Sequence, residues 1–262
     1  MSVYHDQLNR IIELPHLPQR IISTVPSQTE LLFDLGLDEK IVGITGFCTH
    51  PAGKVKTVTK IGGTKKLDIP LIKSLNPDLV IANKEENDRQ QVEALMAVCP
   101  VWISDINDLN GAIGMITGIG DMLNCQAAAK MLSSAILKRF NQLTLPVLSL
   151  RVAYLIWRKP YMVAGTDTFI NSMLQTCGLR NAFDLPRYPE VNIDSLIEAR
   201  PDVVLLSSEP YPFGQKHVEE FRAILPNARI ILVDGEMFSW YGSRLLYAPA
   251  YFEALISKIP SA

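Results

Sequence analysis

Two side chains with metal-binding chemistry lie one residue apart near the amino terminus. Cys48 and His50 belong to the loop 46–51, and thiol and imidazole groups are common ligands of transition metals. A structural zinc site needs four such ligands, so this pair alone does not predict one. One interpretation is that His50, with Cys48 beside it, contacts a metal that a bound chelate already carries. The alternative is a buried thiol beside a hydrogen-bonded imidazole.

The chain lacks the short motifs of the common enzyme classes, since GxSxG, HExxH, GxGxxG and CxxC are all absent. The segment around His217, with Lys216 and Glu219, is typical of a solvent-exposed helix, so this histidine has no evident catalytic partner. Gly62–Lys66 resembles a phosphate-binding loop but lacks the GxxxxGK(S/T) spacing. We therefore predict that the chain is not an enzyme. The catalytic alternative is a pair of carboxylates drawn from Glu30, Glu85, Glu86, Asp167 and Glu209.

Aromatic and basic side chains recur in the segments that follow the predicted strands. Such segments meet at one edge of a parallel sheet, where ligands bind. Aromatic rings with Arg and Lys suit a planar, partly anionic ligand. The alternative for Trp157 is that it simply covers a core. The predicted ligand-binding residues are Ser27, Gln28, Phe47, Cys48, His50, Thr64, Lys84, Trp157, Arg187, Tyr188, Tyr211, Trp240 and Tyr241.

Short apolar runs rich in Ile and Val predict the strands that would position these residues. Most runs are continuous rather than alternating, which is typical of strands buried on both faces of a parallel sheet. Helical stretches lie between them, so the pattern predicts an α/β fold. The predicted strands are Arg20–Val25, Ile41–Thr45, Leu79–Ala82, Val101–Ser104, Val152–Trp157, Val203–Ser207 and Ile230–Val233.

The middle of the chain has helical periodicity without a strand. Residues 124–143 predict one helix about 30 Å long, and Pro146 follows it. A helix of this length between two strand-rich halves suggests a strut. We therefore predict an amino-terminal α/β lobe over 1–107, a helical segment with the inter-lobe helix over 108–146, and a carboxyl-terminal α/β lobe over 147–262.

The two halves also resemble each other. Residues 69–81 and 193–205 both predict a short helix, a Pro-Asp turn and a buried strand. In addition, Ser27 and Glu30 fit a capping box at the start of a helix that follows the first strand. The repeated pattern predicts two similar lobes related by duplication.

The composition excludes several classes of partner. The formal net charge is −2, which argues against a nucleic-acid partner, and no run of 18 apolar residues predicts a membrane span. The four cysteines are widely spaced, so we predict free thiols and a reducing compartment. No secretory leader is visible at the amino terminus. We expect a monomer that is cytoplasmic as encoded, or periplasmic if a leader was removed.

Three segments carry a resemblance to a known family. Ile21–Leu32, Asn76–Ala82 and Arg200–Val204 resemble motifs of the helical-backbone metal-receptor family, the class III substrate-binding proteins for cobalamin, ferric siderophores and haem. The chain is most similar to the cobalamin-binding branch. The resemblance implies two similar lobes with central, mostly parallel sheets, bridged by one long helix, and a ligand in the cleft between them. It also implies no intrinsic cofactor, and a corrinoid, haem or ferric siderophore as the ligand of an ABC importer.

Two positions depart from the family pattern. Transported members present one carboxylate from each lobe to their permease, and the matching positions are Pro70 and Asp194. Asp194 is therefore the predicted docking residue, and Pro70 lacks the charge. The corrin-stacking positions of the cobalamin branch match Phe47, Thr64, Asn83 and Tyr188, of which two are aromatic. The alternative function is a cytoplasmic sensor, carrier or enzyme that uses the same fold on a haem, an iron chelate or a corrinoid.

Overall fold

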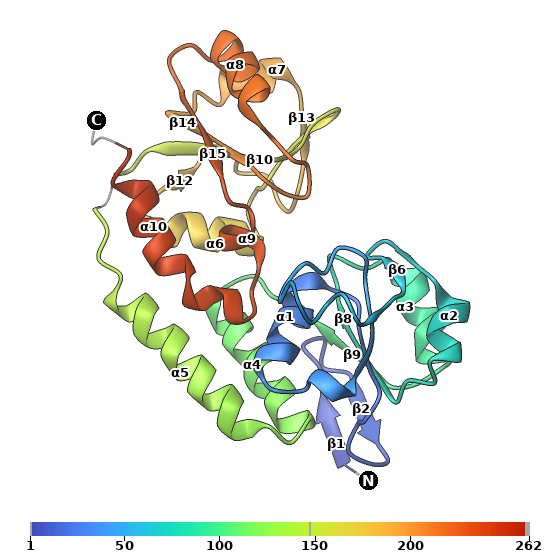
Figure 1. The fold of residues 1–262 in the computed structure, drawn as a ribbon. Helices are drawn as coiled ribbons and strands as arrows, with labels where there is room; N and C mark the ends of the chain where they lie inside the picture. Colours follow the sequence, from blue (N-terminus) through green and yellow to red (C-terminus); the bar gives the residue numbers. More distant parts are fainter. Residues whose placement is uncertain (1, 147, 260–262) are drawn as a thin grey trace. The chain divides into compact units, whose positions relative to one another are not determined.

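The computed structural model describes residues 2–146 and 148–259 and divides them into two compact units. Unit 1 comprises 2–106, 110–138 and 241–244, and unit 2 comprises 107–109, the described part of 139–240, and 245–259. The chain colours of Figure 1 show that unit 1 holds the amino-terminal sheet and unit 2 the carboxyl-terminal sheet. The short segment 241–244 therefore belongs to unit 1, although the residues on either side of it belong to unit 2.

The sheet of unit 1 is parallel throughout, in the order β5-β4-β3-β8-β9. Its strands are β3 (Ile21–Ser23), β4 (Ile41–Ile44), β5 (Thr59–Lys60), β8 (Leu79–Asn83) and β9 (Val101–Ser104). The helices that connect them are α1 (Pro26–Asp34), α2 (Ile69–Ser74) and α3 (Arg89–Met96), with a 3₁₀ turn at Asp38–Lys40. All residues of β3, β8 and β9 are buried, because neighbouring elements cover both faces of these strands.

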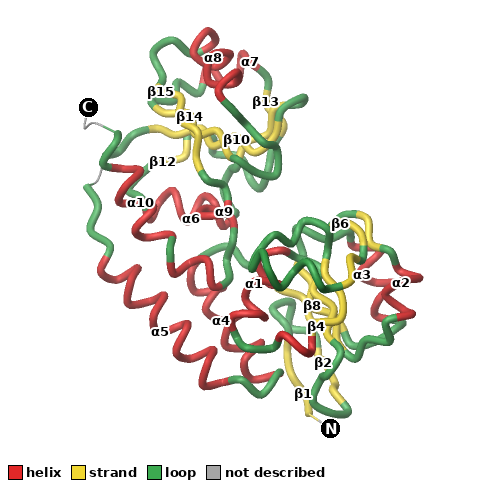
Figure 2. The backbone as a smooth tube through the Cα atoms, in the orientation of Figure 1, coloured by secondary structure: helices red, strands yellow, loops and turns green. Residues whose placement is uncertain are grey.

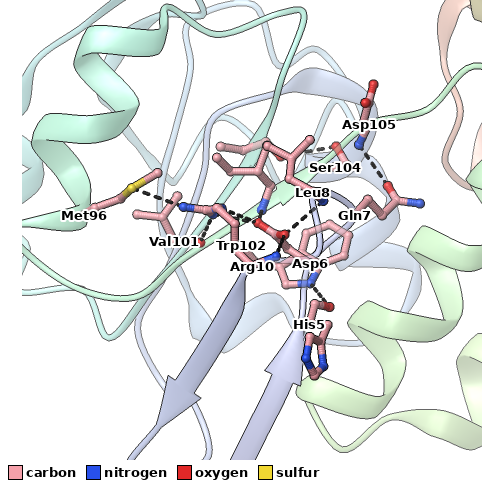
Figure 3. A network of polar contacts seen from close by, with 12 residues as sticks. His5, Asp6, Gln7, Leu8, Arg10, Met96, Val101, Trp102, Ser104 and Asp105 are labelled. Carbon is pink, nitrogen blue, oxygen red and sulfur yellow. Dashed lines mark hydrogen bonds and ion pairs between the residues drawn. The ribbon is translucent and has the colours of Figure 1, made fainter.

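An amino-terminal hairpin precedes this sheet and was not predicted. Its strands β1 (Ser2–His5) and β2 (Ile11–Leu14) pair antiparallel. In the connecting turn the Asp6 carboxylate accepts hydrogen bonds from the backbone N–H groups of Leu8 and Arg10, both at 2.9 Å. The indole N–H of Trp102 donates to the carbonyl of His5, so the hairpin is tied to β9 (Figure 3).

The glycine-rich segment Gly62–Lys66 forms a second hairpin, between β6 (Gly62–Gly63) and β7 (Lys66–Leu67). Gly62 has a φ of +98°, and a Cβ there would lie 2.4 Å from the carbonyl oxygen of Lys66. Only glycine fits this position, so the turn explains the glycine at 62 without a phosphate ligand.

Two helices fill the middle of the chain, α4 (Leu109–Met122) and α5 (Gln126–Gln142). Figure 2 shows this stretch as helix interrupted by one turn, where Asn124 has a φ of +58°. The prediction of a long helix between the halves is confirmed, because α5 contributes 126–138 to unit 1 and 139–142 to unit 2. None of the helices in the described residues is long and apolar enough to cross a membrane.

The sheet of unit 2 has the order β13-β11-β10-β14-β15, and β12 also pairs with β10. Its strands are β10 (Arg151–Trp157), β11 (Tyr161–Val163), β12 (Arg180–Asn181), β13 (Glu190–Val191), β14 (Val203–Ser207) and β15 (Arg229–Val233). The strands β12, β14 and β15 run parallel to β10, whereas β11 and β13 form antiparallel pairs. The helices are α6 (Phe169–Thr176), α7 (Ile193–Glu198), α8 (Gln215–Ile224), α9 (Glu236–Ser239) and α10 (Ala248–Ile256), with a 3₁₀ turn at Ser243–Leu246.

The predicted α/β class is confirmed, and every predicted strand is present within two residues of its expected ends. All four cysteines are free, as predicted. One local prediction is wrong, because α1 starts at Pro26 with Val25 as its N-cap, so Ser27 lies inside the helix. Proline suits this first helical position, since it has no N–H to leave unpaired and its φ is already helical. Glu30 does not reach back to the helix start and instead pairs with Arg244.

Candidate functional site

A buried polar network lies where the strands of unit 1 end. The Thr24 hydroxyl donates to Oδ1 of Asn87 at 2.8 Å, and Nδ2 of Asn87 donates to the carbonyl of Thr64 at 3.0 Å. The Asn83 side chain accepts from the backbone N–H groups of Glu85 and Glu86. These bonds hold the turns that contain the predicted residues Thr64 and Lys84 in one place.

The predicted residues of α1 are buried within this network. Nε2 of Gln28 donates to Oγ of Ser104 at 2.5 Å, and Gln28 is 0% exposed. The Ser27 hydroxyl and Oε1 of Gln28 have no hydrogen-bond partner among the described residues. Lys84 is exposed along its side chain, but its Nζ forms an ion pair with Asp105 at 2.6 Å. Both charges of this pair already have a partner, so Lys84 is held in place.

Phe47 offers the most open aromatic ring of the predicted residues. It is 64% exposed. A Cβ at Gly63 would lie 3.0 Å from Cε2 of Phe47, so the ring rests directly on this glycine. A large exposed ring supported from below is a flat apolar surface onto which a planar ligand can stack.

Cys48 and His50 differ in burial, since Cys48 is buried and His50 is half-buried. The Cys48 sulfur lies 3.2 Å from the Thr29 hydroxyl and 3.3 Å from the Thr45 hydroxyl. Burial raises the pKa of the Cys48 thiol, so at neutral pH it stays protonated, whereas metals bind the thiolate. Within the described residues, no group of three metal-ligating side chains occurs.

The segment 241–244 supplies donors to three carboxylates of unit 1. The Tyr241 hydroxyl donates to Glu86 at 2.5 Å, and Ser243 donates to Asp34. Nε and Nη2 of Arg244 bind the two carboxylate oxygens of Glu30 at 3.1 and 2.5 Å, and both side chains are nearly buried. Burial raises the pKa of Glu30, and Arg244 opposes this shift. Tyr241 is therefore a buried part of unit 1, with 5% exposure.

An aromatic cluster occupies the corresponding end of the sheet in unit 2. Trp157 is 39% exposed, and its ring meets Tyr211 edge-on at 5.7 Å between centroids. Tyr211 in turn contacts Phe213 at 4.8 Å and His217 at 5.4 Å. The prediction that His217 lies on the surface is wrong, because it is 2% exposed. The reason is local, since His217 lies at the third position of α8 and turns back onto the N-cap, Gly214.

Among the remaining predicted residues of unit 2, Trp240 and Arg187 have polar partners. Trp240 is 6% exposed, and its indole N–H donates to Oε1 of Glu209 at 2.8 Å. Nη1 of Arg187 donates to the carbonyl of Asp167 at 2.8 Å. Tyr188 is half-buried, whereas Asp194 is exposed in the first turn of α7. The matching residue of unit 1, Pro70, is exposed in the first turn of α2.

Sequence reasoning missed two residues that hold the predicted ones in place. Asn87 and Ser104 act through contacts with residues far away in the chain, which no local pattern reveals. Glu209 was named only as a candidate carboxylate, and its contact with Trp240 was not predicted. His217 carried a local signal, three residues after a glycine that ends a loop, but glycine lacks the side chain that marks a capping box.

Comparisons with known proteins agree with this architecture. A family model described as periplasmic binding protein matches residues 21–222. The vitamin B12-binding protein of Pectobacterium carotovorum subsp. carotovorum (strain PC1) is 23% identical over 240 residues, which cover 88% of this chain and 86% of that protein. The vitamin B12-binding protein of Vibrio parahaemolyticus serotype O3:K6 is 26% identical over 201 residues, covering 72% and 70%.

Solved structures share the fold. The periplasmic haem-binding protein RhuT from Roseiflexus sp. RS-1 in apo form has a TM-score of 0.77 and 24% identity, covering 91% of this chain and 98% of that one. The periplasmic vitamin B12-binding protein BtuF of Vibrio cholerae has a TM-score of 0.73 and 20% identity, covering 92% and 98%. At these identities the structures establish the fold alone. Because the family model spans most of the chain, the protein belongs to the periplasmic binding protein family and is a substrate-binding protein of class III.

Proposed function

We propose that this protein binds a corrinoid and delivers it to an ABC importer. The observation that carries the proposal is the relationship to vitamin B12-binding proteins along 88% of the chain. Two exposed aromatic rings support it, Phe47 in unit 1 and Trp157 in unit 2. A corrin ring is broad and largely flat, so it can bury such rings without ordering new side chains.

The other predicted residues fit a ligand that brings its own metal. No described cluster would hold a metal by itself, so a chelated ion would arrive with its macrocycle. His50, half-buried in the loop that also carries Phe47, is the candidate axial contact. Cys48 has a raised pKa and stays a thiol, so His50 is the stronger candidate of the two.

An equilibrium titration of the purified chain with cyanocobalamin, dicyanocobinamide and haemin tests the proposal, read by tryptophan fluorescence and visible absorbance. We expect saturable binding of the corrinoids at micromolar concentration or tighter. Phe47→Ala should weaken this binding about tenfold, the loss expected for one stacking ring. The matched control is Met131→Ala on α5, which removes an exposed apolar side chain far along the chain from the predicted loops.

Saturation by haemin alone would show that the protein binds haem rather than a corrinoid. Failure of all three ligands to saturate the chain would overturn the proposed function. A His50→Ala variant that binds aquocobalamin with the wild-type spectrum would remove the axial contact and leave the stacking contacts standing.

The proposed permease partner would dock on α7. Asp194 is exposed there, next to Ile193 and Ile197, which are 43% and 48% exposed. Exposed apolar side chains around one carboxylate are typical of a transient protein interface. Asp194→Lys should leave corrinoid titrations unchanged and reduce uptake in cells that depend on this importer. Unchanged uptake would instead favour the alternative, a cytoplasmic carrier, for which the four free thiols argue.

A further inference from the structure

Tyr211 lies in the loop between β14 and α8, close to the end of β10. Its backbone N–H donates to the carbonyl of Ile156 at 3.3 Å, which ties the loop to the last residues of that strand. Its ring packs edge-on against the exposed ring of Trp157, with 71° between the planes. Tyr211 itself is half-buried. The ring is therefore fixed beside the exposed aromatic surface of unit 2.

The tautomer of His217 follows from its backbone partner. The N–H of Gly214 donates to Nδ1 of His217 at 2.9 Å. A backbone amide can only donate, so Nδ1 accepts and carries no proton. The proton of the neutral imidazole is then on Nε2, which lies 3.2 Å from the Tyr211 hydroxyl oxygen. His217 therefore donates to Tyr211, and the tyrosine oxygen is the acceptor of this bond.

Charge on His217 would not reverse this direction. Burial lowers the pKa of His217, and the nearby Lys216 and Arg158 lower it further, whereas Glu220 raises it. The imidazole is thus neutral at physiological pH. If it gained a proton, the proton would go to Nδ1 and break the bond from Gly214, while Nε2 would keep its own. The Tyr211 hydroxyl hydrogen is in both cases left for a different acceptor.

We infer that the Tyr211 hydroxyl is a dedicated hydrogen-bond donor to an acceptor oxygen on the rim of the bound macrocycle, and that His217 is the positioning residue that sets its direction. This inference rests on the proposed function and adds the chemical group that unit 2 recognises. In a corrinoid the acceptor is a side-chain carboxamide oxygen, and in haem it is a propionate oxygen. Within the described residues, His217 is the partner of this hydroxyl, so its hydrogen is available to a ligand.

Two substitutions at His217, Gln and Glu, have side chains of the same shape but opposite hydrogen-bonding capacity. They show whether ligand binding depends on the direction of the bond between residue 217 and Tyr211 or only on its presence. Gln and Glu at the third helical position both return a hydrogen bond to the N–H of the N-cap. The amide of His217→Gln can still donate to Tyr211 through its NH₂ group. The carboxylate of His217→Glu can only accept a hydrogen bond. The Tyr211 hydroxyl would therefore donate to this carboxylate and would no longer be able to donate to the ligand. A buried carboxylate costs more than a buried amide, so His217→Glu should unfold at a lower temperature than His217→Gln, and the affinities are compared below both transitions.

The experiment measures cyanocobalamin and haemin dissociation constants for the wild type, Tyr211→Phe, the two His217 variants and Tyr211→Phe/His217→Glu. We expect Tyr211→Phe to weaken binding about fivefold, as for one neutral hydrogen bond. His217→Gln should stay within about twofold of the wild type, and His217→Glu should match Tyr211→Phe. In the Tyr211→Phe background, His217→Glu should cause no further loss, because the hydroxyl it captures is already gone.

Three results would overturn the inference. The first is wild-type affinity in Tyr211→Phe, and the second is an equal loss in the Gln and Glu variants, which would mean a structural role. The third is a further loss in the double variant, which would show that the new charge repels the ligand directly. A wild-type chain that binds neither probe overturns the proposed function itself, and is seen before any variant is measured.

Discussion

An aspartate directly precedes the matching strand in each unit, Asp78 before β8 in unit 1 and Asp202 before β14 in unit 2. The Asp78 carboxylate accepts from the backbone N–H groups of Gln19 and Arg20 at 2.7 and 2.9 Å. The Asp202 carboxylate accepts from the N–H of Arg151 at 2.7 Å. The side chains of Arg20 and Arg151 then bind carbonyls at the ends of α2 and α7. The repeat is therefore preserved at the start of the strands, down to single hydrogen bonds.

The opposite ends of the same strands differ. In unit 1 they carry the network around Thr24, Asn83 and Asn87, whose polar groups are buried. In unit 2 they carry the aromatic cluster around Trp157 and Tyr211. The two units therefore share their hydrogen bonds at one end of these strands and differ at the carboxyl ends, where parallel sheets bind ligands.

The largest expected effect removes the nearly buried ion pair of unit 1, because the corresponding arginine–glutamate pair in unit 2, Arg158 with Glu220, is more exposed. Arg244→Met leaves the carboxylate of Glu30 buried without its cation. Breaking a buried ion pair in this way costs about 3–5 kcal/mol of unfolding free energy. Hydrogen exchange measures where the loss falls, and we expect faster exchange in α1 and β4 than in β14.

The control for this prediction is Arg244→Lys, which keeps the charge but cannot form the two-pronged contact with both oxygens of Glu30. We expect its stability to lie between the wild type and Arg244→Met. Equal acceleration of exchange throughout both units would show that the segment 241–244 stabilises the whole chain rather than unit 1.

A smaller effect tests the repeated turn itself. Asp78→Ala should lower the unfolding free energy by about 2 kcal/mol, because two backbone N–H groups lose a charged acceptor. Asp202→Ala should cost about half as much, since its carboxylate accepts one such bond and the residue is exposed. Urea unfolding of both variants measures the ratio. Equal costs would mean that the two turns are energetically equivalent despite their different burial.

The strands of the two sheets could be predicted from the sequence, because a strand that is buried on both faces requires a continuous run of apolar residues. Val203–Ser207 and Leu79–Asn83 are fully buried, and such runs predicted the first in full and the second as Leu79–Ala82. The hairpin formed by β1 and β2 was missed, although Ile11–Leu14 alternates exposed and buried side chains, because four residues are too short for periodicity to decide. The start of helix α1 lies two residues before the predicted one, because proline at its first position outweighed the Ser-Glu pattern.

The site was harder to predict because its geometry depends on distant partners. Nothing near Tyr241 in the sequence indicates that it donates to Glu86, and nothing near Trp240 indicates its contact with Glu209. Phe47 and Tyr211 do follow the ends of β4 and β14, whereas Trp157 is the last residue of β10 and Trp240 follows helix α9. The sequence could not show that Phe47 stays open while Trp240 becomes buried, since exposure is decided by what packs on top.

The smallest effect compares two glutamates, buried Glu30, which pairs with Arg244, and half-buried Glu209, for which the described residues show no arginine partner. A single oxygen of Glu209 accepts from Ser239 at 2.6 Å and from Trp240 at 2.8 Å. Burial raises the pKa of Glu209, and the nearby Glu236 and Asp234 raise it further, against the opposing effect of these hydrogen bonds. The folded state then binds more protons than the unfolded state, so this group's contribution to stability falls as pH rises from the ordinary glutamate value through the raised one.

Glu209→Gln keeps an oxygen for both donors and removes the charge. We therefore expect it to stabilise the protein at neutral pH by about 1 kcal/mol, the usual size of one favourable substitution, and to flatten the fall in stability with pH. Burial raises the pKa of Glu30 as well, but Arg244 opposes that rise and would lose its counter-charge, so the same change at Glu30 should stabilise the protein less than Glu209→Gln does. Urea midpoints measured from acid to neutral pH for both variants test this order. Equal stabilisation by both substitutions would mean that Arg244 adds nothing to the stability of ionised Glu30.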